Sequence, residues 1–426
     1  MDFQSADYER APVPRGVGSS GFSLALIIIG GTIGFSIFIV ASQIGGSLGY
    51  ELGSSAFALG CLILGAMGAT TSFVGSNSRL STYLLTEFAF GPKGAKVVNF
   101  AIALSLIGWF GVITNAVGQT THSMLIDSFD LYVPVGALIV GASALMIGVT
   151  ISGFTGIDRL AVLAVPVMLA FIVYAAYRAQ ASGTPGAPTD IGLTFQTAVS
   201  AVVGTYIAGV IIQPDYSRFA QSNKGAVWGV FAALGVVFPL ILFFSAVPGM
   251  VTGNPDMIQV MLSLGILLPA FFLLFLGAWC SNVLCLYSSS LSMATIATRI
   301  KLSTIIAVVG VIGTVLAFLP VQEYLIGFLV LLGIAIPPIG AVYVIDAALI
   351  RRFDLEIATL EAAKPVRLDA FISWASAISA GFLSENGIVG IVNISSLDSL
   401  IVSAVVFIGL NAKAVFSPNL LQTNQT

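Results

Sequence analysis

Charged residues are scarce in this chain. Only 8% of its 426 residues are Asp, Glu, Lys or Arg, whereas 57% are hydrophobic. A typical soluble domain carries about 25% charged residues. Because so few charges cannot cover the surface of a soluble protein of this length, we expect an integral membrane protein. The net charge of −3 is small, and we expect no nucleic-acid partner.

Metal-ligating and nucleophilic residues are also few. The chain has one histidine, His122, so a histidine-based metal centre is not expected. A membrane enzyme would need a cluster of acids, histidines or a nucleophile–base pair, which argues against an enzyme. The three cysteines lie in apolar runs and are predicted to be small buried residues; they are Cys61, Cys280 and Cys285.

Carboxylates are almost absent from the middle of the apolar runs. Asp346, Glu385 and Asp398 all lie near the ends of such runs. A proton relay through buried acids is therefore poorly supported. A neutral ligand and a cation held by carbonyls and hydroxyls fit the composition better.

Apolar runs fill most of the chain, and none shows the alternation of a barrel strand. Runs of this length predict transmembrane helices. We count twelve candidate spans: 22–46, 54–76, 97–124, 132–152, 159–178, 193–213, 226–251, 262–292, 303–319, 323–348, 369–390 and 395–416.

Lysine and arginine set the predicted orientation. If the N-terminus is cytoplasmic, only Arg178 of the 16 basic residues falls outside. Cytoplasmic loops carry an excess of such residues. We therefore predict polar cytoplasmic tails at 1–21 and 417–426, in a protein of the inner (plasma) membrane. The piece STYLLTEFAFGPKG after the second span is too short to cross and predicts a short helix on the cytoplasmic side.

Glycines interrupt two spans that lie five apart: Gly30, Gly31 and Gly34 in the first, Gly204 and Gly209 in the sixth. Glycine destabilises a helix interior by roughly 1 kcal/mol relative to alanine. Close packing of helices is one explanation. The other is a discontinuous helix whose freed backbone groups line a site at the bilayer midplane. Because five is odd, a second five-helix repeat would be inverted relative to the first, and paired broken helices are typical of transporters.

Aromatic and polar residues lie at mid-depth in three spans. Trp109 and Phe110 lie in the third span, Tyr206 in the sixth, and Ser281 and Asn282 in the eighth. Core packing would explain the aromatics; the alternative is a pair of aromatic walls for a flat ligand. Asn282 is the more suggestive polar residue, because an amide is costly to bury in a membrane.

Eight motifs in chain order resemble the nucleobase–cation symporter family one, and within it the bacterial cytosine permeases. The resemblance covers nearly the whole chain. The motifs are APVP, TSFVG, EFAFGPKG, GWFGV, PDYSRFA, LYSSSL, IGTVLA and AIPPIGAVYVIDAALIRR.

The resemblance implies an all-α membrane protein with the five-plus-five inverted-repeat (LeuT-like) transporter fold and two accessory helices. The first repeat would span 22–178, the second 193–348, and the accessory helices 369–416. A protein of this kind is expected to work as a monomer in the lipid bilayer.

The resemblance also implies site residues. The family's two aromatic walls, which sandwich a planar heterocycle, fall on Trp109 and Tyr206. Phe110, beside Trp109, is included among the expected substrate-binding residues. The sodium site of sodium-coupled members falls on five positions: Gly34, Ile37, Gly277, Cys280 and Ser281.

Departures from the family's pattern concern polarity. Cys280 replaces a hydroxyl of the sodium site, and a thiol is a poor ligand for a hard cation, so we predict weak or altered sodium dependence. Leu106, Ile113 and Leu284 stand where relatives carry polar residues, so the pocket is predicted to be less polar. The donors and acceptors expected to remain are Ser36, Thr205 and Asn282.

The favoured function is a secondary transporter that imports a nucleobase, such as a cytosine-like pyrimidine or a purine, with a cation, Na⁺ or H⁺, by alternating access. No other cofactor is expected. The alternatives are a permease for hydantoin or allantoin, a vitamin-like heterocycle or an amino acid. A channel would need a repeated or oligomeric filter, and no filter-like repeat is visible.

Overall fold

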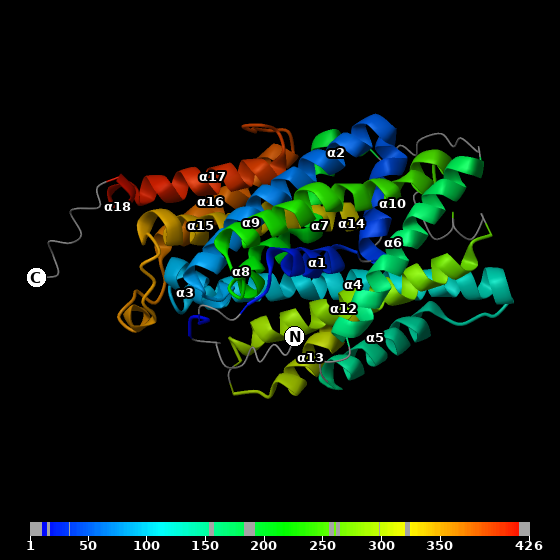
Figure 1. Cartoon of the computed structure of the whole chain (residues 1–426), viewed down its shortest axis with the longest axis horizontal. Helices are drawn as coiled ribbons and strands as arrows, with labels where there is room; N and C mark the ends of the chain where they lie inside the picture. Colours follow the sequence, from blue (N-terminus) through cyan, green and yellow to red (C-terminus); the bar gives the residue numbers. More distant parts are fainter. Residues whose placement is uncertain are drawn as a thin grey trace, which may run out of the picture.

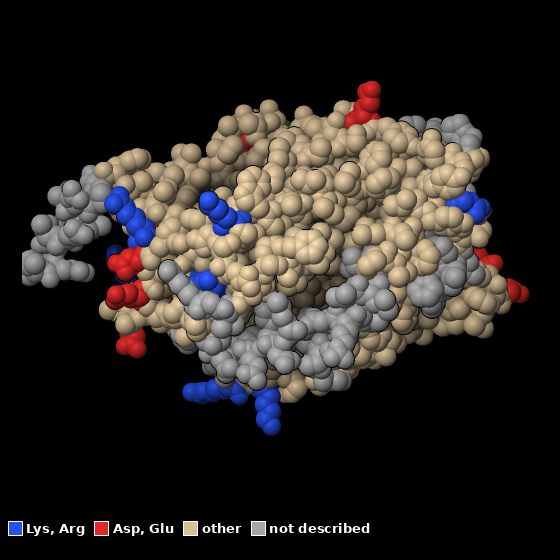
Figure 2. All heavy atoms as spheres, viewed as in Figure 1, with Lys and Arg blue, Asp and Glu red and all other residues tan. Residues whose placement is uncertain are grey.

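The computed structural model describes residues 11–14, 18–33, 35–152, 157–182, 192–254, 260, 265–297, 299–319 and 324–416. Most helices run along the long axis of the molecule (Figure 1). On the face shown in Figure 2, charged side chains gather mainly toward the two ends of this axis, with a belt of other residues between them. This distribution fits a protein whose middle lies in hydrocarbon.

All twelve predicted ranges contain helix. The first half forms α1 (Gly21–Thr32), α2 (Phe35–Ser78), α3 (Thr82–Phe90), α4 (Gly94–Phe129), α5 (Val135–Ser152) and α6 (Ile157–Ser182). The next part forms α7 (Phe195–Ile211), α8 (Gln213–Ser217), α9 (Asn223–Phe231), η3 (Ala232–Val237), α10 (Phe238–Thr252) and α12 (Leu267–Ala294). The remainder forms α13 (Leu302–Leu316), α14 (Leu325–Ala335), α15 (Pro337–Ile345), η4 (Asp346–Ile350), η5 (Ile357–Leu360), α16 (Leu368–Glu385), α17 (Ser395–Leu410) and α18 (Ala412–Phe416).

Length and composition alone mark four helical stretches of the described chain as able to cross a membrane: Ile37–Ser78, Gly94–Phe129, Asn223–Thr252 and Leu325–Ile350. Several other predicted spans contain shorter apolar helices, among them Val135–Ile151, Phe195–Ile211, Leu302–Leu316 and Ser395–Leu410. Gly49, with φ 70°, turns the chain between the first two predicted spans inside α2. The number of membrane crossings therefore stays a prediction, whereas the predicted short helix after the second span is present as α3.

The first predicted span is broken. α1 ends at Thr32 and α2 begins at Phe35, and Ile33 between them has φ −90° and ψ 84°, outside the helical region. Gly34 lies outside the described residues. The carbonyl of Ile29 accepts hydrogen bonds from the Ile33 amide at 3.1 Å and from the Thr32 hydroxyl at 2.8 Å. The Ile29 carbonyl near the end of α1 is thus satisfied by the last turn of the helix itself.

The sixth predicted span is also broken, but not at its central glycines. α7 continues through Gly204 and Gly209 and ends at Ile211, and α8 begins at Gln213. Pro214 has no N–H group for a continuing helix. A Cβ on Gly204 would lie 2.0 Å from the carbonyl oxygen of Leu329 in α14. The expectation that Gly204 marks a break is wrong, because this glycine allows close helix packing instead.

The segments predicted to lie on the cytoplasmic side contact one another. The Ser19 amide donates to the Phe219 carbonyl at 2.8 Å, which joins the N-terminal tail to the loop after the sixth span. The Lys93 amide donates to the Pro365 carbonyl, also at 2.8 Å, which joins the loop after the second span to the loop after the tenth. These segments therefore share one end of the molecule.

The opposite end shows matching contacts. The Thr197 hydroxyl donates to the Glu385 carboxylate at 3.0 Å, and the Tyr50 hydroxyl donates to the Gln180 carbonyl oxygen at 2.9 Å. Thr197 and Glu385 lie near predicted outer ends of spans, and Tyr50 and Gln180 lie in predicted outer loops. The grouping of loops agrees with the alternation that the basic residues predict.

A buried ion-pair network fixes the end of the tenth span. The Asp346 carboxylate, 1% exposed, accepts from Arg351 Nε at 2.8 Å and from Arg367. Both arginines also donate to the Phe88 carbonyl in α3, at 3.2 Å and 3.1 Å. Because the buried carboxylate has two partners, its charge is compensated, and η4, α3 and α16 are tied together.

Candidate functional site

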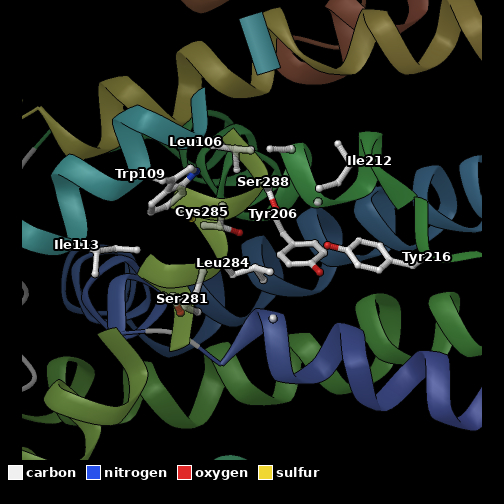
Figure 3. Close-up of a pocket in the computed structure, with 15 residues that line it drawn as sticks. Leu106, Trp109, Ile113, Tyr206, Ile212, Tyr216, Ser281, Leu284, Cys285 and Ser288 are labelled. Atoms are coloured by element: carbon white, nitrogen blue, oxygen red, sulfur yellow. The ribbon is translucent and has the colours of Figure 1, made fainter. Parts of the chain in front are cut away.

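A small cavity lies where both broken helices meet α4 and α12 (Figure 3). Its volume is about 90 Å³, several times the roughly 10–15 Å³ that one water needs. The cavity is therefore large enough for a small organic ligand rather than a single water. It is lined by Gly31, Ile37, Leu106, Trp109, Ile113, Thr205, Tyr206, Ala208, Gly209, Ile212, Tyr216, Ser281, Leu284, Cys285 and Ser288.

The two predicted aromatic walls both line this cavity. Trp109 projects from α4 and Tyr206 from α7, and they lie on opposite sides of Cys285 and Leu284 in the view of Figure 3. The Trp109 ring is 5% exposed and packs edge-to-face on Phe328 of α14, with ring centroids 5.7 Å apart. The Trp109 ring is thus held on one side by the protein, as a rigid binding wall requires.

Two glycines make room for the Tyr206 ring. A Cβ on Gly31 of α1 would lie 3.1 Å from the Tyr206 hydroxyl oxygen. A Cβ on Gly209, one turn along α7, would lie 2.7 Å from the ring carbon that carries this hydroxyl. Glycine at these positions therefore lets the ring lie directly against the backbone of both helices.

The lining residues carry hydroxyls, one thiol and the indole N–H of Trp109. Five residues supply hydroxyls that can both donate and accept: Thr205, Tyr206, Tyr216, Ser281 and Ser288. The Thr205 hydroxyl already donates to the Val202 carbonyl at 2.6 Å, so it is left mainly as an acceptor. Among the described lining residues none carries a formal charge, which suits a neutral ligand.

Aliphatic side chains complete the wall. Leu106 and Ile113 of α4 and Leu284 of α12 line the cavity, at the positions where the sequence predicts lower polarity. Apolar walls cannot replace hydrogen bonds that a ligand leaves behind in water. A ligand here would meet hydroxyls and aromatic rings rather than charged groups.

The proposed cation residues are only partly described. Ile37 at the start of α2 and Ser281 of α12 both line the cavity, which brings these two helices together at one point. Gly277 is buried one turn before Ser281. Gly34 and the side chains of Ser36 and Cys280 lie outside the described residues.

Two predicted ligand-binding residues do not line the cavity. The Asn282 amide nitrogen donates to the Thr114 hydroxyl at 2.7 Å and faces Phe110 O at 3.3 Å and Met146 Sδ at 3.1 Å. Asn282 is fully buried between α12, α4 and α5. Phe110 packs against the backbone of Gly313 in α13. Successive residues on a helix point about 100° apart. Asn282 and Phe110 therefore point away from the cavity that Ser281 and Trp109 line, and they contact neighbouring helices instead.

Sequence reasoning did not place five lining residues at the site, Ala208 and four others. Ile212 and Tyr216 follow the break in the sixth span, where the prediction places the span's end. Ser288 and Cys285 lie on the same face of α12 as Ser281. The Tyr216 hydroxyl interacts with that of Ser288. The motif PDYSRFA could have pointed to Tyr216, and the spacing of 281, 285 and 288 could have pointed to this face.

The cysteines differ from one another. Cys61 is fully buried, as predicted, whereas Cys285 is partly buried and lines the cavity. Within the described residues there is no cluster of three or more His, Cys, Asp or Glu side chains that could hold a metal. A cation on the cavity would have to be held by carbonyl and hydroxyl oxygens.

Known proteins of similar sequence are permeases. The chain is 28% identical to cytosine permease of Escherichia coli (strain K12) over 410 residues, which covers 92% of each protein. It is 27% identical to hydantoin permease of Microbacterium maritypicum over 364 residues, which covers 78% of this chain and 73% of the relative.

The fold is similar to that of Mhp1, a nucleobase-cation-symport-1 family transporter. The TM-score is 0.79 against its closed form with bromovinylhydantoin bound, at 21% identity and with 95% of each chain covered. The inward-facing form of Mhp1 gives the same TM-score. The predicted all-α inverted-repeat transporter fold is confirmed. A family profile also matches residues 21–400, and the chain therefore belongs to the family of permeases for cytosine/purines, uracil, thiamine and allantoin.

Proposed function

We propose that this protein imports a neutral nucleobase or a similar planar heterocycle together with a cation, by alternating access. The observation that carries the proposal is the uncharged cavity between Trp109 and Tyr206, at the meeting point of two broken helices. Stacking of one base on an aromatic side chain contributes about 1–3 kcal/mol. Sites at paired helix breaks are typical of transporters with repeated architecture.

A ring fits the cavity better than an amino acid. An amino acid would bring a carboxylate and an ammonium group, and the described lining residues offer no charged partner to either. The hydroxyls of Ser281, Ser288 and Tyr206 can meet both donors and acceptors on the edge of a heterocycle. The relatives named above are permeases for cytosine and for hydantoin, both planar rings.

A hydantoin-like or other less polar heterocycle is the second candidate. The aliphatic wall of Leu106, Ile113 and Leu284 favours it, because this wall offers no hydrogen bond to the amino and carbonyl groups of cytosine. A substituted ring with an apolar edge would leave fewer polar groups unpaired.

Sodium is the cation we favour. Ile37 and Ser281 lie together at the cavity, and their backbone and hydroxyl oxygens are suitable ligands for a hard cation. A proton carrier would need a titratable acid, and no described lining residue is a carboxylate. Cys280 stands in place of a hydroxyl and weakens the set of oxygen ligands for sodium. We therefore infer that transport depends only weakly on the sodium concentration.

The protein is proposed to lie in the inner membrane with both termini cytoplasmic. The excess of basic residues in the loops at one end supports this orientation. Its repeats are proposed at 22–178 and 193–348, its accessory helices at 369–416, and its working unit as the monomer. An enzymatic role is not proposed, since the family consists of permeases.

The proposal is tested first by ligand-induced stabilisation. Nucleobases, hydantoins and vitamin-like heterocycles are added to purified protein, with and without sodium, and the unfolding temperature is measured. A ligand that binds only the folded protein raises it by mass action. Hits are then tested for uptake into proteoliposomes. A shift only with amino acids, or binding without uptake, would overturn the proposal.

A further inference from the structure

Tyr343 in α15 is among the largest fully buried side chains described, with 0% exposure. Its hydroxyl donates to the carbonyl oxygen of Ile211 at 2.9 Å. Ile211 is the last residue of α7, directly before the break. A helix that the site does not include therefore makes a hydrogen bond to the break that shapes the site.

The break leaves the Ile211 carbonyl without its helical partner. In a continuous helix the amide of Asp215 would donate to it. That amide instead donates to the Ile212 carbonyl at 3.0 Å, and Pro214 has no amide hydrogen. A buried carbonyl without a donor is unfavourable, so the Tyr343 hydroxyl stabilises the broken form over the continuous one.

Gly340 adds a second contact at the same junction. It lies three residues before Tyr343, and residues with this spacing share a helix face. A Cβ on Gly340 would lie 2.5 Å from Cδ1 of Ile211 and 3.9 Å from Cγ2 of Thr71 in α2. The α15 face that carries Gly340 and Tyr343 thus fits against the end of α7.

The residues that follow this junction are walls of the cavity. Ile212 is the next residue and Tyr216 lies one turn further, and both line the cavity, whereas Tyr343 does not. The segment also leads to the loop that contacts the N-terminal tail through Ser19 and Phe219. Any movement at Ile211 is therefore transmitted to the cavity wall on the side we assign to the cytoplasm.

We propose that Tyr343 is a positioning residue. Its hydroxyl fixes the α7–α8 junction so that Ile212 and Tyr216 close the cavity on that side. The assignment of the closed side to the cytoplasm rests on the proposed function. The role of Tyr343 in closing the cavity does not rest on it. Loss of the hydroxyl should open the cavity more often without changing any residue that lines it.

The test uses Cys285, which lines the cavity, as a reporter. In a background with Cys61→Ala and Cys280→Ala, the rate of labelling of Cys285 by a small maleimide is measured in detergent. Tyr343→Phe should label at least about fivefold faster than the parent, the change expected for roughly 1 kcal/mol between two states. Tyr177→Phe, which changes a tyrosine that is 68% exposed, should label at the parental rate.

A second variant guards against loss of folding. Gly340→Val displaces Ile211 by bulk rather than by loss of a hydrogen bond, and it should also speed labelling. Thermal unfolding of each variant identifies those that fold. Parental labelling rates in whichever of the two variants folds would overturn the proposal. Since labelling needs no ligand, absence of heterocycle uptake by the parent would sink the proposed function and leave this result standing.

Discussion

The two helix breaks beside the cavity are stabilised in different ways. At the first, the Ile29 carbonyl accepts from the amide of Ile33 and the hydroxyl of Thr32, both within the last turn of α1. At the second, the carbonyl of Ile211 is capped by Tyr343 from α15, more than 130 residues away in the chain. The carbonyl of Ile29 is thus satisfied locally, whereas the carbonyl of Ile211 depends on tertiary packing.

The glycines around the breaks also differ in role. Gly31 and Gly209 leave room for the Tyr206 ring, and Gly204 lets α7 approach the backbone of α14. None of the three is at a break in the described structure. A glycine in a membrane span therefore indicates that another group lies close to the helix backbone. The surrounding structure determines whether that group is a ring, another helix or a ligand.

Gly204→Ala should have the largest effect on stability. The added methyl group would overlap the Leu329 carbonyl at 2.0 Å, and because this atom is backbone, the helices must separate. We expect a loss near the upper end of the roughly 1–3 kcal/mol typical of overpacking. Thermal unfolding in detergent measures it, with Gly141→Ala, which meets nothing within 4 Å, as the control. Equal midpoints would mean that α7 and α14 are not closely packed.

Removing either aromatic wall should weaken ligand binding. For Trp109→Ala and Tyr206→Ala we expect a loss of roughly 10- to 150-fold, from about 1–3 kcal/mol of stacking per ring. Tyr206→Phe should be mild if stacking dominates and severe if the hydroxyl binds the ligand. Calorimetry with a ligand found by stabilisation gives the affinities. Near-parental affinity in both alanine variants would show that the rings only pack the core.

Gly31→Ala should act on the Tyr206 ring with a smaller effect. Its Cβ would lie 3.1 Å from the Tyr206 hydroxyl oxygen, so the ring must shift by a few tenths of an ångström. We expect a loss of affinity below about tenfold, at unchanged stability, because the obstacle is the tip of a side chain. If Tyr206→Phe relieves the loss in the double variant, the contact is direct. Additive losses would separate the two residues.

Asp215→Asn should have the smallest effect and tests the segment after the second break. Burial raises the pKa of the Asp215 carboxyl, and Arg218 and the Thr82 amide partly offset this. A raised folded pKa means that the ionised carboxyl is disfavoured, so stability falls as pH rises through that pKa. Asparagine keeps an oxygen for the Thr82 amide, which donates at 2.8 Å.

We therefore expect Asp215→Asn to unfold within about 0.5 kcal/mol of the parent at neutral pH. Its stability should also depend less on pH over the range in which this carboxyl titrates. Thermal unfolding across a pH series compares the two proteins. A strong destabilisation at neutral pH would show that the ionised Asp215 holds α8 to α3 through charge.

The sequence was sufficient for the helices and for some of the residues that line the cavity. Trp109 and Tyr206 stood out because large aromatics at mid-depth are unusual. The prediction that Asn282 lines the cavity was wrong. A helix inside a membrane protein can be buried on all sides, so a buried polar residue can face another helix as easily as a cavity. Tyr216 was missed because hydropathy places the end of a span, not the direction in which the chain continues after a break.

The uncharged cavity has an electrical consequence. With no fixed charge among the described lining residues to accompany or oppose the cargo, a neutral ring carried with one monovalent cation moves one net positive charge per cycle. A membrane potential of 100 mV, negative inside, then contributes about 2.3 kcal/mol to each inward cycle. That is enough for roughly 50-fold accumulation of the ring even without a cation gradient. Uptake in vesicles should produce an inward current proportional to the number of rings transported.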